Sequence, residues 1–483
     1  MTRVLVPGTL LTLISIVYLF GVAPDMTWMG LAGDSPDYVA AATNFQRAGL
    51  GGYPLYITIG WVFEQVFHFG FGFNTYWSLA LLSAVSTVVT CGFIYGIIRL
   101  YSSSSLPAVL GTLAYASSLL VWTQSVIPEV YTITVMFMVM GVYFLLKEKY
   151  YLSAFIFGLS LCTHPLALFA VLPSLVYVIK VTENRPSIIK LLLVGGLGLI
   201  PWIQFLASSP DNAYAGLSTG GLSWVLSSTG YIGGLAVFPT DTLVMRLEDF
   251  GPILGLGLCI VIPFYILGFR SFRTNSVVLL LGVIALLPIL LYVTSTPSQW
   301  ITYIVPSIAF LAILGGILAN QVDIKSVTAV ASVCGLGLLG LNLYFYDIGR
   351  SVDPSPTTMR QAYEKLDELP SNAVVYSHTW GHMGVLLGTY NQSKDDRLVR
   401  VDSTKDKGFG GVKVEDTNDA AYRVLADLYR METKTHSGKE IYVTYLKDRT
   451  KVQFDLVPLS HYRHDLNDVP QFSSADGGRV RIP

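Results

Sequence analysis

The sequence has few charged residues for its length. Lys, Arg, Asp and Glu make up 13% of the 483 residues, against about 25% in a typical soluble domain. Hydrophobic residues make up 52%. This composition excludes a single water-soluble globule and favours burial of much of the chain in a membrane. The net charge is −1, so the charge balance does not indicate a nucleic-acid partner.

Cysteine is also scarce. Four cysteines occur, all in apolar runs: Cys91, Cys162, Cys259 and Cys334. In such runs each is expected to pack as a small hydrophobic side chain. Their number and spacing predict no disulfide framework, and they leave the redox compartment of the protein open.

The few charges are unevenly distributed along the chain. The first 346 residues carry 24 charged side chains and the last 137 carry 39. The sequence therefore predicts a membrane domain over residues 1–346 and a water-facing domain over residues 347–483. The second domain alternates β-rich and helix-like runs, which is typical of a small α/β domain. The β-rich runs are 372–377, 440–446 and 452–457, and the helix-like runs are 357–368 and 417–432.

Apolar runs of roughly membrane-spanning length recur through the first domain. They lie at 4–24, 75–99, 106–125, 129–146, 188–206, 250–269, 275–294, 301–319 and 326–346. The first run is too long for the core of a signal peptide and is expected to be a retained first span. Residues 151–180 allow one long helix or two short ones broken at His164-Pro165, because proline disfavours a helical residue before it.

The positions of the basic residues distinguish these two alternatives. With two short helices, ten of the twelve Lys and Arg residues of the membrane domain fall on the inner side, and only Arg47 and Arg246 fall outside. With one long helix, six of the ten would move outside, against the positive-inside rule. We therefore predict about 11 transmembrane helices, a cytoplasmic N-terminus and an external or lumenal C-terminal domain, in the cell membrane or endoplasmic reticulum.

This topology gathers the unusual polar residues on the outer side. Two large outer loops are predicted, at 25–74 and 207–249. The residues concerned are Asp34 and Asp37 in the first loop, Arg246 in the second, Glu129 at the start of the fourth helix and His164 at the tip of the short hairpin. Chemistry or binding is therefore expected to face the lumen or the cell exterior.

The first outer loop predicts two helices. Pro36 suits the first position of a helix that runs to Ala48, after which the glycines at 49–52 end it. Residues 54–68 then form an apolar run with few polar positions, which favours a helix lying on the membrane interface.

The polar residues also have purely structural interpretations. Asp34 can cap the helix that begins at Pro36, Glu129 can interact with the dipole of the helix that it begins, and His164 can be a hydrogen-bonded turn residue. Asp34, Asp37 and His164 are of metal-ligating types, but their spacing matches no metal motif. The sequence therefore supports no particular cofactor, and it leaves the need for a divalent metal open.

Three stretches of the membrane domain resemble a known family in their order and spacing. They are Gly33-Asp34-Ser35-Pro36-Asp37 with Gly52-Tyr53-Pro54-Leu55-Tyr56, then Trp122 to Tyr131, then Gly158 to Pro173. Together they are similar to the transmembrane-protein-260-like protein O-mannosyltransferases of the GT-C glycosyltransferase superfamily. Residues 369–376 and 454–458 resemble the post-membrane domain of that family. Two departures, Gly49-Leu50-Gly51 for His-Pro-Pro and Asp37 for a frequent Glu, bear on donor and acceptor preference.

The resemblance implies a mainly helical GT-C-like fold and a donor sugar, mannose or another hexose, carried on polyprenyl or dolichyl phosphate. The acceptor would be a Ser or Thr hydroxyl of a protein, or a glycan hydroxyl. By position, Asp34 is the catalytic acidic residue of the first outer loop, and a carboxylate there can take the proton of the hydroxyl. The implied substrate-binding residues are Asp37, Tyr53, Glu129, His164 and, for the phosphate, Arg246.

Two other functions compete with this one. A transporter or flippase of lipid-linked sugars is expected to show paired halves with broken helices, and no such repeat is seen. A non-catalytic membrane scaffold that binds glycans is expected to tolerate replacement of Asp34 by its neutral isostere.

Overall fold

The computed structural model describes residues 2–24, 35–43, 45, 53–181, 186–202, 257–268, 275–294, 298–322 and 324–345, together with five strands of the C-terminal region. The chain divides into two compact units. The first comprises Met1–Asp25 and Phe45–Ser351, and the second comprises Met26–Asn44 and Val352–Pro483. The division after Ser351 lies close to the predicted boundary, whereas Met26–Asn44, which we assigned to the membrane domain, groups with the second unit.

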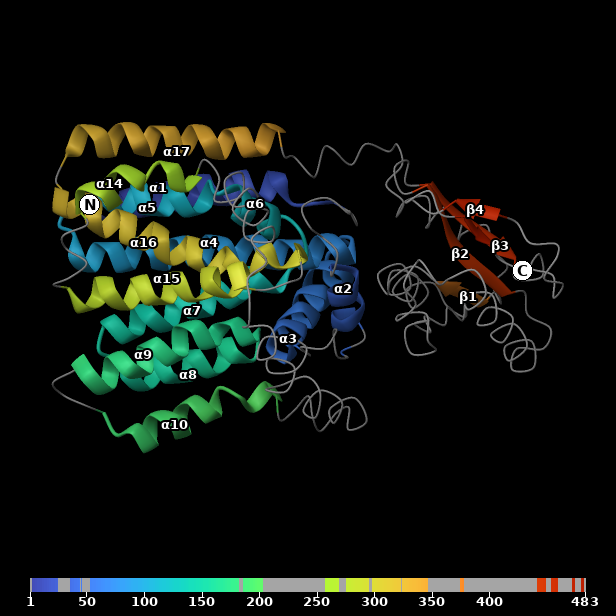
Figure 1. Ribbon diagram of the computed structural model, residues 1–483, viewed down its shortest axis with the longest axis horizontal. Coiled ribbons are helices and arrows are strands. Elements are labelled where there is room, and N and C mark those ends of the chain that lie inside the picture. Colours follow the sequence, from blue (N-terminus) through green and yellow to red (C-terminus); the bar gives the residue numbers. More distant parts are fainter. Residues whose placement is uncertain are drawn as a thin grey trace. The chain divides into compact units, whose positions relative to one another are not determined.

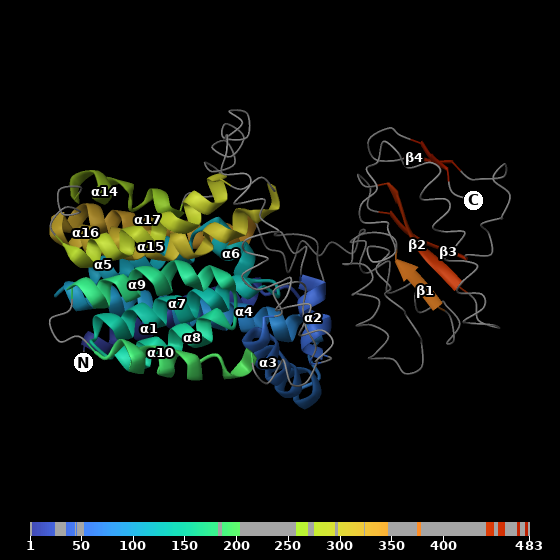
Figure 2. The same ribbon diagram turned by 60° about the horizontal axis from the view of Figure 1, so that its bottom comes forward.

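The first unit is a bundle of helices (Figures 1 and 2). Every predicted apolar run contains at least one of them. The helices are α1 (Thr2–Gly21), α3 (Pro54–Phe63), η2 (Glu64–Gly70), α4 (Thr75–Tyr101), α5 (Leu106–Ala116), α6 (Leu119–Ser125), α7 (Val130–Leu146), α8 (Tyr150–Leu161), η3 (Pro165–Ala167), α9 (Leu168–Val181), α10 (Ile188–Leu197), α14 (Ile262–Gly268), α15 (Ser276–Thr294), η6 (Ser298–Ile304), α16 (Val305–Val322) and α17 (Lys325–Phe345).

Several of these helices are suited to a bilayer. Among the described residues, four helical segments are long and apolar enough to cross a membrane, or five if the bent pair α5–α6 is one span. The four lie in α4, α15, α16 with the end of η6, and α17. The chain is thus an integral membrane protein with several apolar helices, while the total of 11 spans stays a prediction.

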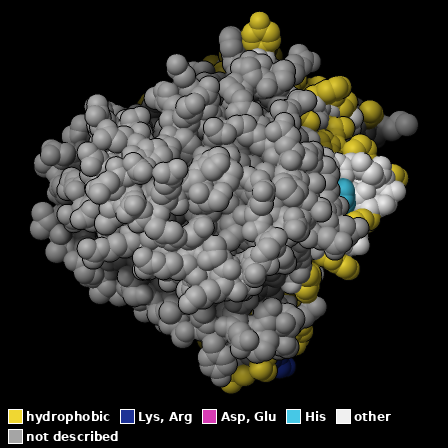
Figure 3. Space-filling model, turned by 90° about the vertical axis from the view of Figure 1, so that its right-hand side faces the viewer, with side chains coloured by type: hydrophobic (Ala, Val, Ile, Leu, Met, Phe, Trp, Pro, Cys, Tyr) yellow, Lys and Arg dark blue, Asp and Glu magenta, His cyan; other side chains and the backbone are white. Residues whose placement is uncertain are grey.

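The core of the bundle is built around α16. This helix is buried along nearly all its length, and it packs against α4, α5, α14 and α15. The outer surface of the bundle instead exposes large apolar side chains such as Ile189, Ile266 and Val330. In the view of Figure 3, the described side chains are likewise mostly hydrophobic. Such a surface suits contact with lipid rather than water.

The third predicted span is not one straight helix. α5 and α6 meet at an angle of 65°, so the predicted run over 106–125 is bent, and whether it is one span stays a prediction. The carbonyls at the break accept hydrogen bonds from side chains of other helices. The Tyr18 hydroxyl donates to Ala116 O at 2.8 Å, and the Asn342 amide donates to Ser117 O at 2.9 Å. These bonds satisfy backbone groups that the break removes from the helix ladder.

The break at His164 is confirmed. α8 ends at Leu161, and η3 and α9 follow after three residues. α8 packs against α7 and α10, whereas α9 packs mainly against α15. α8 and α10 meet so closely that a Cβ atom at Gly158 would overlap the carbonyl of Gly195. Gly195 and Gly198 therefore serve helix packing, as small residues often do in membranes.

The predicted first outer loop contains a helix at each of the two expected positions, the first of them Ser35–Thr43 rather than a helix to Ala48. α2 (Ser35–Thr43) belongs to the second unit, and it begins one residue before Pro36. The apolar run after Tyr53 forms α3 and then continues as the π-helix η2, whose wider winding the sequence did not predict. Helices of this type are frequent at functional sites.

The C-terminal part of the second unit contains strands at all three predicted β-rich runs. β1 (Val374–Ser377) pairs in parallel with β2 (Ile441–Asp448), which pairs antiparallel with β3 (Gln453–Pro458). β4 (Gln471–Ser473) and β5 (Arg479–Arg481) form a second, antiparallel pair. The helix-like runs lie outside the described residues, so the α/β class of this domain stays a prediction.

Candidate functional site

His164 is buried at the point where the chain turns between α8 and η3. Its side chain is 2% exposed, and its backbone is extended, with φ −165° and ψ 144°. The Nδ1 atom accepts a hydrogen bond from the backbone N–H of Leu166 at 3.1 Å, which caps η3. The predicted structural role as a turn residue is therefore present, and it occupies only one of the two ring nitrogens.

Three tyrosines surround this imidazole ring. Tyr53 stacks on it at a centroid distance of 5.4 Å with an interplanar angle of 8°. Tyr131 lies at 5.4 Å and 47°, and Tyr303 lies edge-on at 5.7 Å and 64°. We call these four residues the tyrosine–histidine cluster. It joins segments far apart in the sequence, so packing of the bundle assembles it.

Tyr53 enters the cluster with an unusual backbone conformation. Its φ of 45° and ψ of 52° lie in the left-handed region, which is uncommon for a residue with a side chain. The start of α3 is held in place because the N–H of Leu55 donates to Cys162 O at 3.1 Å, at the end of α8. This bond ties Tyr53 to the turn that carries His164. Strained backbone held by its surroundings is typical of functional sites.

Tyr131 and Tyr303 complete the cluster from two other elements. Tyr131 lies in the first turn of α7, and Tyr303 lies in η6, just before α16. Their rings also contact each other, with centroids 6.0 Å apart. Sequence reasoning placed Tyr131 in a family-like stretch without a role and missed Tyr303, because residue 303 falls inside an apolar run that predicts only a span.

Glu129 immediately precedes α7 and is 2% exposed. Its backbone is extended, with φ −146° and ψ 145°, and its side chain makes no capping hydrogen bond to α7. The Ser83 hydroxyl takes that role: it accepts the Glu129 N–H at 3.1 Å and donates to Glu129 O at 3.3 Å. Glu129 therefore stands just before the first turn of α7, which begins at Val130, and its interaction with the helix dipole stays a prediction.

The Glu129 carboxylate lies near tyrosine hydroxyls. It acts electrostatically on Tyr131 and on Tyr56 of α3. Burial, and to a smaller extent Glu129 and Tyr76, raises the pKa of Tyr56 well above its ordinary value, so this hydroxyl stays protonated. Glu129 and His164 thus share Tyr131 as a neighbour.

The imidazole of His164 is uncharged at neutral pH. It lies in the connection between α8 and η3, outside both helices, and burial lowers its pKa from 6.5 to about 3. Because Nδ1 accepts a hydrogen bond, the neutral ring carries its proton on Nε2. The site therefore combines a neutral N–H donor, a buried carboxylate and several aromatic rings.

The remaining predicted site residues cannot be positioned against this cluster. Asp34 and Arg246 lie outside the described residues, as does the side chain of Asp37. No group of three His, Cys, Asp or Glu side chains suited to a metal ion occurs within the described part of the chain. Cys91 and Cys162 are buried, as predicted, whereas Cys259 and Cys334 are exposed on the helix surface.

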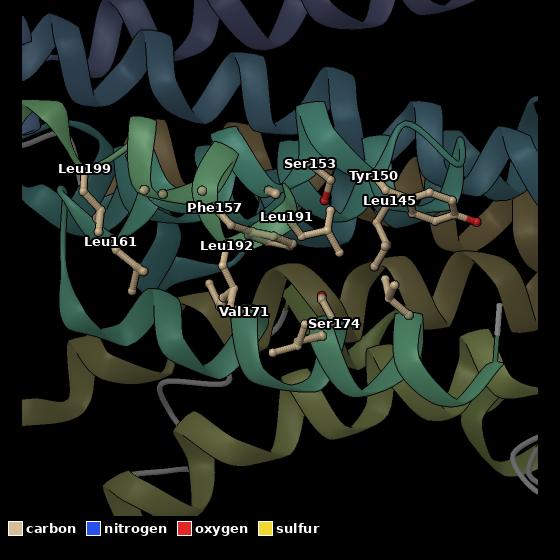
Figure 4. Close-up of a pocket in the computed structure, with 16 residues that line it drawn as sticks. Leu145, Tyr150, Ser153, Phe157, Leu161, Val171, Ser174, Leu191, Leu192 and Leu199 are labelled. Atoms are coloured by element: carbon tan, nitrogen blue, oxygen red, sulfur yellow. The ribbon is translucent and has the colours of Figure 1, made fainter. Parts of the chain in front are cut away.

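An apolar cavity of about 230 Å³ lies beside the hairpin that carries His164. Figure 4 shows its lining residues extending from Leu161 and Leu199 at one end to Leu145 and Tyr150 at the other. The lining comes mainly from α8, α9 and α10, and most of it is Leu, Val, Phe and Gly. The shape and chemistry of this cavity suit a hydrocarbon chain.

Comparisons with known proteins agree with this description. Residues 34–187 match the family model for the protein O-mannosyl-transferase TMEM260 N-terminal domain. The crystal structure of ArnT from Cupriavidus metallidurans bound to undecaprenyl phosphate is similar, with 13% identity, a TM-score of 0.63, and coverage of 96% of this chain and 99% of that chain. The apo structure of ArnT from the same organism is 12% identical, with a TM-score of 0.58 and coverage of 90% of this chain and 92% of that chain. An Archaeoglobus fulgidus oligosaccharyltransferase in complex with Zn and sulfate is 12% identical, with a TM-score of 0.48 and coverage of 90% of this chain and 67% of that chain.

The two kinds of comparison establish different things. Similarity to ArnT at this low identity establishes the fold alone, whereas the family model identifies the enzyme class of residues 34–187. The family resemblance drawn from the sequence is therefore confirmed. Together with the apolar helices, the match of residues 34–187 indicates a membrane glycosyltransferase. Tyr53, Glu129 and His164 all lie within the matched segment.

Proposed function

We propose that this protein transfers a hexose, mannose in the first instance, from a polyprenyl or dolichyl phosphate to a hydroxyl group of a protein Ser or Thr or of a glycan. One observation carries the proposal. Tyr53, Glu129 and His164, from three separate segments of the region that matches an O-mannosyl-transferase domain, converge on one buried cluster. Buried carboxylate, imidazole and tyrosine groups together provide the hydrogen-bonding chemistry that a sugar substrate requires.

A lipid-linked donor is supported by two further observations. The similar ArnT structure is described as bound to undecaprenyl phosphate. In this protein an apolar cavity begins at Leu161, close in the chain to His164. A polyprenyl chain lying partly in this cavity would bring its phosphate toward the end of the bundle that carries the cluster.

The proposed reaction is a single displacement with inversion at C1 of the sugar. The Asp34 carboxylate takes the proton of the acceptor hydroxyl while its oxygen attacks C1. The bond between C1 and the phosphate oxygen breaks, and polyprenyl phosphate leaves. Arg246 stabilises the charge on this phosphate, while Asp37, Tyr53, Glu129 and His164 bind the substrates.

The proposed orientation places this chemistry outside the cytoplasm. The N-terminus is cytoplasmic, and the cluster and the C-terminal domain face the cell exterior or the lumen of the endoplasmic reticulum. The distribution of basic residues among the predicted loops supports this assignment. Labelling of single cysteines introduced at Ser102 and Ser393 tests it, because only the second is expected to react from outside.

The proposed function is tested by incubating the purified full-length protein with a panel of polyprenyl-phosphate sugars and an acceptor peptide. Mass spectrometry is expected to detect transfer from at least one donor. Asp34→Asn keeps the size and capping ability of the residue but cannot accept a proton. We expect it to lower transfer by about two to four orders of magnitude with little change in thermal stability.

Asp37→Asn is the comparator, since it removes a proposed substrate-binding carboxylate of the same loop and leaves the proposed base in place. Full activity of Asp34→Asn would reject Asp34 as the base. A wild-type protein that moves lipid-linked sugars across vesicle membranes but transfers none of them would reject the proposed function and favour a flippase.

A further inference from the structure

The ring of His164 has a polar atom that the fold does not use. Nδ1 is occupied by the N–H of Leu166, so Nε2 carries the proton. Within the described residues, Nε2–H makes no hydrogen bond, although the side chain is only 2% exposed. Tyr53 and Tyr131 pack on the ring and keep it from turning. A ligand atom that reaches this N–H group and accepts a hydrogen bond is its natural partner.

The surroundings of this N–H group favour a sugar hydroxyl over a phosphate. The cluster contributes no positive charge, because the imidazole is neutral, and the Glu129 carboxylate lies beside Tyr131. A phosphate would be repelled by the carboxylate. A hydroxyl can accept from Nε2–H, and a hydroxyl can also donate to the carboxylate. The tyrosine rings add apolar surface that suits the C–H groups of a pyranose.

We infer that Glu129 and the Nε2–H of His164, within the tyrosine–histidine cluster, bind hydroxyl groups of the sugar that is transferred. This inference rests on the proposed function and assigns the phosphate of the donor to other residues. The pair then acts in donor specificity, because a site built to hydrogen-bond a hydroxyl rejects a sugar that lacks it or presents it on the other face.

Two substitutions of His164 separate this role from the cap on η3. Asparagine can still accept the N–H of Leu166 but has no donor at the position of Nε2. Glutamine is longer and can place an amide N–H there. The full-length protein is tested in detergent with undecaprenyl-phosphate mannose as donor and with undecaprenyl phosphate, which has no sugar, as a binding probe.

His164→Asn is expected to raise the KM for undecaprenyl-phosphate mannose at least about tenfold, the effect of one buried hydrogen bond. The Kd for undecaprenyl phosphate is expected to stay within about twofold of wild type. His164→Gln is expected to recover most of the lost affinity for the sugar donor. His68→Asn is the matched control, because His68 is a half-buried histidine outside the cluster whose ring is hydrogen-bonded to the carbonyl of Phe73, and it should change neither value.

Two results would overturn the inference. If His164→Asn weakens binding of undecaprenyl phosphate as much as binding of the sugar donor, His164 contacts the phosphate. If His164→Asn leaves both values unchanged, His164 is only a cap. Failure of the proposed function would look different: the wild-type protein would transfer no sugar, while equilibrium binding of the two lipids would still report on His164.

Discussion

Glu129 and His164 occupy equivalent places in two different turns of the helix bundle. Each precedes a helix in extended conformation, each is 2% exposed, and each lies next to a proline. They differ in what caps the helix. The His164 side chain caps η3 itself, whereas the Glu129 side chain does not cap α7, and Ser83 bonds the backbone of residue 129 instead.

The difference in capping indicates which of the two side chains has a structural role. One nitrogen of His164 stabilises its turn, so a substitution that removes this acceptor affects both the fold and the proposed site. The Glu129 carboxylate contributes no capping bond, so its burial near Tyr56 and Tyr131 has no explanation in the start of α7. In the proposed function, this carboxylate binds substrate.

The largest effect that would sharpen this comparison is expected at Glu129. Glu129→Gln keeps the shape of the side chain but removes its charge. We expect kcat/KM for sugar transfer to fall about 10- to 100-fold, the range for a hydrogen bond to a buried charged group, with little change in the melting temperature. Steady-state kinetics and thermal unfolding in detergent measure both. If Glu129→Gln instead lowers the melting temperature and leaves kcat/KM unchanged, Glu129 stabilises the fold and does not bind substrate.

The next effect concerns pH and involves only the histidine turn. The pKa of His164 is about 3 in the folded protein against 6.5 as the ordinary value, so the unfolded chain binds a proton that the folded protein does not. The associated stability is present above pH 6.5 and is lost as the pH falls toward 3, by about 1.4 kcal/mol per unit.

Comparison with His164→Asn isolates this contribution from the carboxylates, including Glu129. The other side chains that face the ring are those of Tyr53, Tyr131 and Tyr303. Between pH 7 and pH 5 the wild-type protein should lose more stability than the variant. Equal losses in chemical unfolding experiments would show that the buried imidazole does not stay neutral in the folded protein.

A third, smaller effect is expected at Ser83. Ser83→Ala removes both hydrogen bonds to the backbone of Glu129 and leaves its buried N–H without this partner. We expect a loss of about 1–2 kcal/mol in the free energy of unfolding. Ser86→Ala is the matched control, since the Ser86 hydroxyl donates to Leu82 O within its own helix, α4. Equal effects of the two variants would show that Ser83 does not cap α7.

The smallest effect is the cap on η3. His164→Ala removes the bond to Leu166, whereas His164→Asn can keep it. We expect the alanine variant to be less stable than the asparagine variant by about 1 kcal/mol, measured by unfolding at pH 7.5, where the histidine is neutral in both states. Identical stabilities of the two variants would show that the His164 side chain does not stabilise the start of η3.

The sequence by itself determined the apolar runs that became helices, because burial in a bilayer demands long stretches without charge. It also predicted the break before Pro165, since proline restricts the residue that precedes it, and the three strands β1, β2 and β3 from their β-rich composition. The family resemblance, which the comparisons confirm, came from local stretches whose order is written in the chain.

Only the tertiary structure decided how the polar residues are used. The contact of Ser83 with Glu129, the bend between α5 and α6 and the entry of Tyr303 into the cluster all depend on packing between distant segments. Local patterns carry no information on such contacts, because a residue next to a proline looks the same whether its own side chain or another helix caps the turn. The fold class was therefore readable from composition and periodicity, whereas the site required the packed bundle.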